Sequence, residues 1–222
     1  MGKKNKNNMK PKKFIFKDSI TLVSPTGLRA QNLREFLNIL ETCPDKVVFH
    51  HLYQSHLKYA YILRDFPNDF ANWAAEALED VALAEKLASF DPFNFPAVSQ
   101  LRGVLTAIVE EHLWDLPTVP WVRPGFEFYF SWATTIVSPT NIVVSNLAEF
   151  KKALGAIPET SLYYHFYEAR KRHKERRSDD FSVWIETNFG LPAVVEKIRE
   201  IDFYFFSLVE IKEMLSEILE EI

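Results

Sequence analysis

A set of four residue types that could support acid–base chemistry occurs twice in the sequence. Its members are His51, Tyr53, Asp69 and Trp73 in the first half, and His165, Tyr167, Asp180 and Trp184 in the second. A carboxylate beside an imidazole favours the protonated ring and can make it a proton donor or acceptor in a reaction. The histidines and aspartates are therefore candidate catalytic residues. The tyrosines and tryptophans are candidate ligand-binding residues in the walls of a pocket.

A structural interpretation explains the same residues and is preferred. Asp69 and Asp180 precede aromatic residues where a helix is predicted to start, so each can cap that helix, with Asn68, Asp179 and Ser178 as alternative caps. The histidine would then bond the cap, and the tryptophan would lie in the core. No nucleophile is shared by the two halves, since Cys43 corresponds to Ile157. This difference argues against acyl transfer.

Other chemical sites are poorly supported. The six glycines are too far apart to form a dinucleotide-binding or phosphate-binding loop, so no cofactor is expected. A single cysteine, with neither a His-Glu-x-x-His pattern nor a calcium-loop carboxylate series, predicts no metal site.

A basic run over residues 170–177 is a candidate anion site. Its cationic candidates are Arg170, Arg172, Lys174, Arg176 and Arg177. Cations also suit the C-terminal end of a helix, so a solvated helix end is the simpler interpretation. The net charge is −4 although the first thirteen residues are rich in lysine, and this acidic balance argues against nucleic acid as the main ligand.

The repeated residues belong to a longer internal similarity. The segment Val23-Ser24-Pro25-Thr26 recurs as Val137-Ser138-Pro139-Thr140, and the same offset pairs Phe14 and Phe16 with Phe128 and Phe130. The similarity predicts a disordered Lys-rich tail (1–13), a first repeat domain (14–113), a Pro-rich linker (114–125) and a second repeat domain (126–222).

Each predicted domain is an α+β unit that is mainly helical. Short strands are expected at 14–16 and 20–23, and at 126–130 and 134–137, with Ser-Pro-Thr interrupting the chain after them. About five helices should follow in each copy. The first should start at Asn32 or Asn146, where Glu three residues later completes a capping box. The two copies are expected to be related by a pseudo-twofold axis.

The motif Asn68-Asp69-Phe70-Ala71-x-Trp73 is preceded by a helix that carries His51 and by Asn-Leu-x-Glu. With these elements the chain resembles an uncharacterised prokaryotic family of unknown function (family 5752), whose domain occurs singly or in tandem. The resemblance covers nearly the whole chain except the Lys-rich start. It implies a prokaryotic cytoplasmic protein and no particular activity. The second copy departs from the pattern, with Asp179 in place of the asparagine.

The sequence has no secretory signal and no membrane-spanning run, so we expect a cytoplasmic protein without a membrane partner. The preferred hypothesis is a non-catalytic protein that binds an unknown protein or small-molecule ligand, as a monomer or weak homodimer. An enzyme that uses a His-Asp pair in a Trp- and Tyr-walled pocket is one alternative. Anion or nucleic-acid binding through residues 170–177 is another.

Overall fold

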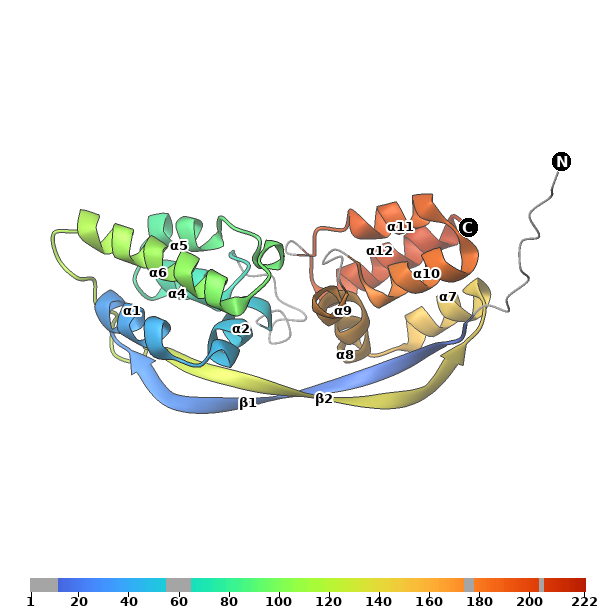
Figure 1. Cartoon of the computed structure of the whole chain (residues 1–222), viewed down its shortest axis with the longest axis horizontal. Helices are drawn as coiled ribbons and strands as arrows, with labels where there is room; N and C mark the ends of the chain where they lie inside the picture. Colours follow the sequence, from blue (N-terminus) through green and yellow to red (C-terminus); the bar gives the residue numbers. More distant parts are fainter. Residues whose placement is uncertain (1–11, 55–64, 174–177, 204–205) are drawn as a thin grey trace. The chain divides into compact units, whose positions relative to one another are not determined.

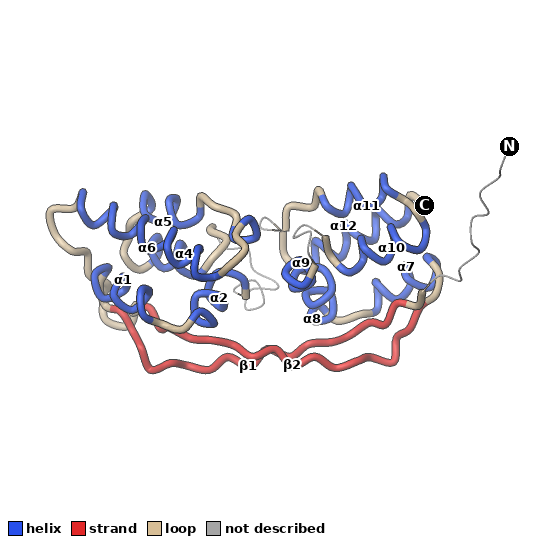
Figure 2. The backbone as a smooth tube through the Cα atoms, viewed as in Figure 1, coloured by secondary structure: helices blue, strands red, loops and turns tan. Residues whose placement is uncertain are grey.

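The computed structural model describes residues 12–54, 65–173, 178–203 and 206–222, so most of the predicted Lys-rich tail lies outside the described residues. Two long strands, β1 (Phe14–Ala30) and β2 (Phe128–Val144), pair side by side and run in opposite directions (Figure 1). Helices account for most of the remaining described chain (Figure 2). The predicted α+β class, mainly helical, is confirmed.

The helices of each half follow its strand, and the first helix of each half begins directly after Asn32 or Asn146, as predicted. The first half holds α1 (Leu33–Thr42), α2 (Asp45–Tyr53), α4 (Asp69–Glu76), α5 (Val81–Ala88), the short 3-10 helix η1 (Pro92–Asn94) and α6 (Val98–Asp115). The second half holds α7 (Leu147–Ala156), α8 (Glu159–Leu162), the π-helix η2 (Tyr163–Glu168), α9 (Ala169–Arg172), α10 (Asp180–Phe189), α11 (Pro192–Arg199) and α12 (Leu208–Glu220). No helix in the described part of the chain combines the length and hydrophobicity that crossing a bilayer requires.

The prediction of short, interrupted strands was wrong. Each strand is continuous for 17 residues and runs through the proline that was expected to end it, Pro25 in β1 and Pro139 in β2. In a two-stranded sheet each strand has one edge without a partner. A proline, which lacks a backbone N–H donor, is tolerated on such an edge. Proline therefore predicts a strand end less reliably in an isolated pair than in a larger sheet.

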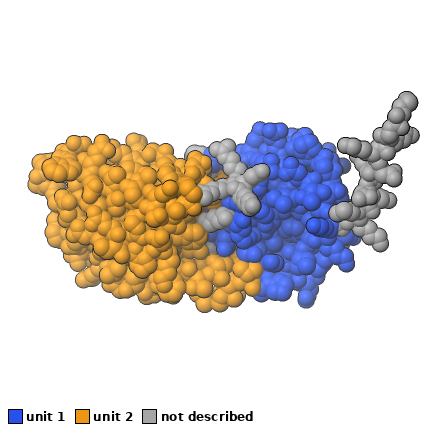
Figure 3. Space-filling view, viewed as in Figure 1, with its two compact units in different colours: residues 1–18, 138–202, 210–222 blue, residues 19–137, 203–209 orange. Residues whose placement is uncertain are grey.

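The chain folds into two compact units (Figure 3). The boundaries between the units fall within both strands. Unit 1 comprises residues 1–18, 138–202 and 210–222, and unit 2 comprises residues 19–137 and 203–209. The first described residues of β1 thus belong with helices of the second half. The first residues of β2 belong with helices of the first half. Each unit therefore combines helices of one half with the first residues of the strand that belongs to the other half. The boundaries of the two repeat domains remain a prediction from the sequence.

The same aromatic packing forms the core of each unit. In unit 2, Phe36 of α1 stacks on Trp73 of α4 with ring centroids 4.9 Å apart, and Phe128 and Phe130 of β2 pack against them. In unit 1, Phe150 of α7 stacks on Trp184 of α10 at 5.1 Å, and Phe14 and Phe16 of β1 take the corresponding places. Burying two phenylalanine rings contributes several kcal/mol to each core, at about 1.5–3 kcal/mol per side chain.

Capping boxes fix the start of the first helix in each half, as predicted. The Asn32 side chain accepts the Glu35 N–H at 2.8 Å, and that of Asn146 accepts the Glu149 N–H at 2.9 Å. Glu149 in turn accepts the Ser145 N–H at 2.8 Å, one residue before the cap. The backbone N–H and the hydroxyl of Ser145 hold the pKa of Glu149 below its ordinary value.

Loss of the Asn146 cap should destabilise the protein. The substitution Asn146→Ala leaves the Glu149 N–H without its side-chain acceptor, so the free energy of unfolding should fall by about 1 kcal/mol in urea titrations followed by circular dichroism. Asn146→Asp, which supplies an equivalent acceptor, is the matched control and should stay near the parent value. Equal losses in the two variants would show that the hydrogen bond is not what matters.

Candidate functional site

The aspartates of the repeated set follow the helix caps and are not caps themselves. Asn68 caps α4 by accepting the Ala71 N–H at 2.9 Å, and Asp179 caps α10 by accepting the Ser182 N–H at 2.8 Å. Asp69 and Asp180 are the first residues of these helices. The preferred assignment of the cap was therefore one residue too late, and Asp69 and Asp180 are placed to bond histidine instead.

Each histidine joins its aspartate to a strand backbone. His51 Nδ1 lies 2.8 Å from Asp69 Oδ2, and His51 Nε2 accepts the backbone N–H of Ser131 at 3.0 Å. A ring nitrogen that accepts an N–H carries no proton, so Nδ1 holds the proton and donates it to the carboxylate. The predicted contact between His51 and Asp69 is present, with the ring in one defined tautomer.

The second pair repeats this geometry in unit 1. His165 Nδ1 lies 2.7 Å from Asp180 Oδ2, and His165 Nε2 accepts the backbone N–H of Lys17 at 2.8 Å. Both imidazoles are buried, each with 3% of the side chain exposed. Lys17 lies in β1 and Ser131 in β2, so each histidine holds the strand that enters its unit.

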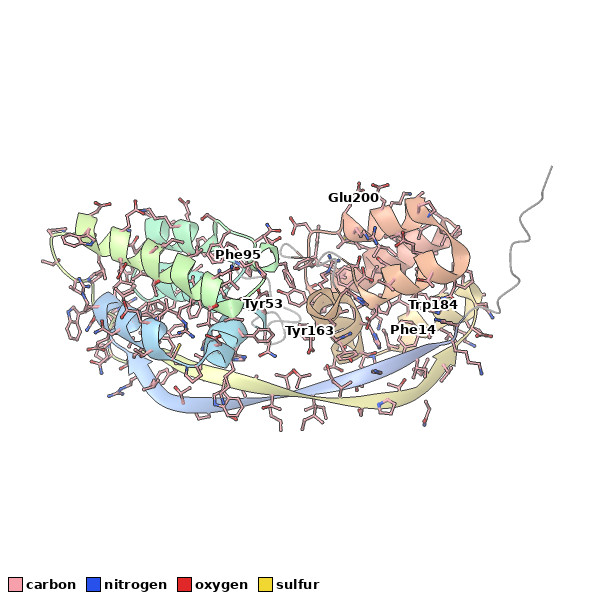
Figure 4. The ribbon with its side chains drawn as sticks, in the orientation of Figure 1. Phe14, Tyr53, Phe95, Tyr163, Trp184 and Glu200 are labelled. Carbon is pink, nitrogen blue, oxygen red and sulfur yellow. The ribbon has the colours of Figure 1, made fainter. Side chains whose placement is uncertain are left out.

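The tryptophans hold the chain five residues earlier, just before each strand begins. Trp73 Nε1 donates to the carbonyl of Phe126 at 2.9 Å, and Trp184 Nε1 donates to the carbonyl of Lys12 at 2.6 Å. We call residues 12–17 and 126–131 the docked segments. Each presents two phenylalanine rings to its unit, and Figure 4 shows Phe14 beside Trp184.

Asp180 is the centre of a larger polar cluster in unit 1. It also accepts hydrogen bonds from the Arg172 guanidinium at 2.6 Å and from His173 Nε2 at 2.8 Å. Burial raises the pKa of Asp180. The hydrogen bond from His165, the charge of Arg172 and the bond from His173 together outweigh burial and hold this pKa below its ordinary value. The carboxylate is therefore ionised under ordinary conditions.

A cavity of about 280 Å³ opens beside the pair in unit 2. Its lining residues are His51, Asp69, Asn72, Trp73, Glu76, Ala77, Phe126, Glu127, Phe128 and Tyr129. Three of the predicted site residues, His51, Asp69 and Trp73, are thus brought together at one wall.

The predicted tyrosines do not line this cavity. Tyr53 donates its hydroxyl to the carbonyl of Pro92 at 2.7 Å, and its side chain is buried. Tyr167 is buried in unit 1 and stacks on Tyr163 with ring centroids 5.2 Å apart. Both tyrosines therefore occupy core positions in this structure.

Arg170, the first residue of the basic run, does not lie on the surface. Arg170 is 2% exposed, with its Nε donating to the Phe166 carbonyl at 3.2 Å and a guanidinium nitrogen 3.9 Å from Asp179. Arg172 bonds Asp180 and lies over the Tyr164 ring. Arg170 is therefore corrected from a solvated helix end to a buried cation. Lys174, Arg176 and Arg177 lie outside the described residues.

Some residues that shape the site were not identified as such from the sequence. Phe14, Phe16, Phe128 and Phe130 fill the space beside the histidines, and Asn188 accepts the N–H of Lys12 at 2.6 Å. The repeated Phe-x-Phe was the available signal. Within the described ranges, no three His, Cys, Asp or Glu side chains form a group that could hold a metal ion.

Comparison with known proteins gives the family. The model of a family of unknown function, DUF5752, matches residues 11–220. The chain belongs to DUF5752. The family resemblance predicted from the sequence is thus confirmed, whereas the tandem duplication and the prokaryotic source stay predictions.

A solved structure is similar to this DUF5752 chain over nearly its whole length. This structure, described as "The structure of OrfY from Thermoproteus tenax", is 30% identical in sequence. The match covers 95% of both chains with a TM-score of 0.74. No curated protein is significantly similar to the chain.

Removal of His165 should cost stability because two partners lose their bonds. In His165→Ala the Lys17 N–H and the Asp180 carboxylate both lose a buried partner, so the free energy of unfolding should fall by about 2–4 kcal/mol. The matched control is His173→Ala, which removes one partly exposed bond to the same carboxylate and should cost about 1 kcal/mol. Urea denaturation measures both, and a smaller effect for His165→Ala would contradict the strand-holding role.

The low pKa of Asp180 should make unit 1 sensitive to acid. Because the folded-state pKa lies below the unfolded value of about 3.9, the ionised carboxylate stabilises the fold above that pH. This stabilisation should disappear as pH falls through the folded-state pKa. Asp180→Asn should therefore be less stable than the parent at neutral pH, and the difference should shrink in acid. A constant difference from neutral to acidic pH, measured by urea denaturation, would show that ionisation of Asp180 does not stabilise the fold.

Proposed function

We propose that this protein is a non-catalytic binding protein whose ligand occupies the cavity of unit 2. The observation that carries the proposal is the cavity itself, which lies beside the repeated His-Asp-Trp set and has polar groups and aromatic rings in its wall. A volume of about 280 Å³ is at the small end of ligand sites, which commonly measure about 300–1,000 Å³. A small molecule, or one side chain of a partner, fits this volume better than a nucleotide does.

The lining favours a cationic ligand group. Asp69, Glu76 and Glu127 supply carboxylates, and the described lining residues include no lysine or arginine. Aromatic rings come from Trp73, Phe126, Phe128 and Tyr129. Carboxylates pair with an ammonium or guanidinium group, and the face of an indole or phenol ring attracts the same cations. A small amine, a guanidine or a lysine or arginine side chain has the chemistry that this wall complements.

Catalysis by the His51–Asp69 pair is a second candidate because the pair lies at the wall of a cavity. The hydrogen bonds of the imidazole argue against it. Nε2 is the nitrogen that would accept a proton from a substrate, and it already accepts the Ser131 N–H. To act as a base, the ring would have to give up a buried hydrogen bond that holds β2. Binding without catalysis needs no such loss.

Small cations should stabilise the protein in thermal unfolding. We expect choline, arginine or putrescine in excess to raise the melting temperature, whereas uncharged analogues of similar size should not, because a ligand that binds only the folded state stabilises it. Glu127→Gln should reduce the shift. Glu111→Gln removes the same charge from the exposed face of α6 and is the matched control.

Two outcomes of this experiment would contradict the proposal. One is the absence of a shift with all three cations, and the other is an equal reduction in the two variants, which would indicate non-specific charge. His51→Ala separates the two candidate functions. A binding protein should show the cation-dependent shift without turnover, whereas turnover that is lost in His51→Ala would support the enzyme.

A further inference from the structure

We infer that unit 1 is a receptor for an extended Phe-x-Phe segment, and that a second copy of this chain can supply that segment through strand exchange. Residues 12–17 occupy the receptor in the folded chain. The inference concerns unit 1 and does not depend on a ligand in the cavity of unit 2.

The receptor holds the backbone of the docked segment at both ends. The backbone N–H of Lys12 donates to Asn188 Oδ1, and the backbone carbonyl of Lys12 accepts the Trp184 indole N–H, each at 2.6 Å. Lys17 donates its N–H to His165 Nε2 at 2.8 Å, and Thr140 donates its hydroxyl to the Phe16 carbonyl at 2.7 Å. These bonds engage main-chain atoms, as in receptors that bind an added β-strand.

Two aromatic side chains supply the specificity. Phe14 packs against the rings of His165, Trp184 and Phe181, with centroids 4.9–5.7 Å apart. Phe16 stacks on Phe150 at 5.5 Å and is fully buried. The receptor therefore requires two rings spaced two residues apart, both on the same side of an extended segment.

The residues around these rings favour a basic segment. The hydrogen bonds from Ser145 are the main cause of the lowered pKa of Glu149, and the charge of Lys13 adds a smaller contribution. The Lys17 ammonium lies 6.0 Å from the centre of the Tyr164 ring. The docked segment of unit 2 has Glu127 in place of Lys13. Charge thus distinguishes the two docked segments.

The order of the chain makes exchange between copies possible. The docked segment 12–17 is followed by the main part of unit 2, residues 19–137, and the helices of unit 1 come only after it. The receptor and its segment are therefore joined by a long stretch of chain, and a second copy can make every bond described above. The local concentration of the covalently attached segment favours the closed chain, whereas high protein concentration favours exchange.

The receptor can be tested with the full-length chain carrying Phe14→Ala and Phe16→Ala. A peptide of residues 12–19 should bind it with one peptide per chain in isothermal titration calorimetry. The matched peptide with both phenylalanines changed to alanine should bind at least about 100-fold more weakly, because each ring is buried in the receptor. If the variant does not fold alone, recovery of its helical circular dichroism on adding the peptide becomes the measurement. Absence of binding and of recovery, or equal binding of the two peptides, would overturn the inference.

Exchange between copies is tested by mixing two full-length variants. One carries Phe14→Ala and Phe16→Ala and has an intact receptor, and the other carries Trp184→Ala and has an intact segment. We expect a heterodimer of twice the chain mass in light scattering after size exclusion, absent from either variant alone. Adding the 12–19 peptide in excess should dissociate it. Peptide binding without a heterodimer would overturn the second copy as the occupant.

Discussion

One hydrogen-bond relay, from a helix carboxylate through an imidazole to a strand N–H, recurs in both units, and the rest of each core is arranged around it. In unit 2 the relay runs from Asp69 through His51 to Ser131. Because the ring accepts on one side and donates on the other, it can satisfy two buried polar partners at once. The relay places a strand backbone against helices, so the neighbouring phenylalanines enter the core in one register.

The features that were predicted correctly depend on short stretches of sequence. A capping box needs only Asn and Glu three residues apart, so Asn32 and Asn146 could be recognised directly. The His-Asp contact was predicted because the same two residue types recur in both halves at similar separations. The exact cap was missed because Asn68 and Asp69, like Asp179 and Asp180, are adjacent residues with similar capping ability.

The exchange of strand starts could not be predicted, for a physical reason. Phe14 and Phe16 match Phe128 and Phe130 in type and spacing, so either pair satisfies either core by hydrophobicity alone. Which pair of rings enters which core depends on the 17-residue length of each strand. This length was not predicted because the prolines indicated shorter strands. The burial of Arg170 could not be predicted for a similar reason, because a run of basic residues does not indicate which of its side chains point into the core.

The prolines in the strands have a consequence for solubility. Large aliphatic side chains are exposed along both strands, among them Ile20, Leu22 and Ile136. Unpaired strand edges with such side chains are templates on which further chains can add to form fibrils. Pro25 and Pro139 each remove one donor from the strand and interrupt any ladder that would use it. Prolines at such positions are typical of gatekeeper residues, which oppose the addition of further strands to an edge that exposes aliphatic side chains.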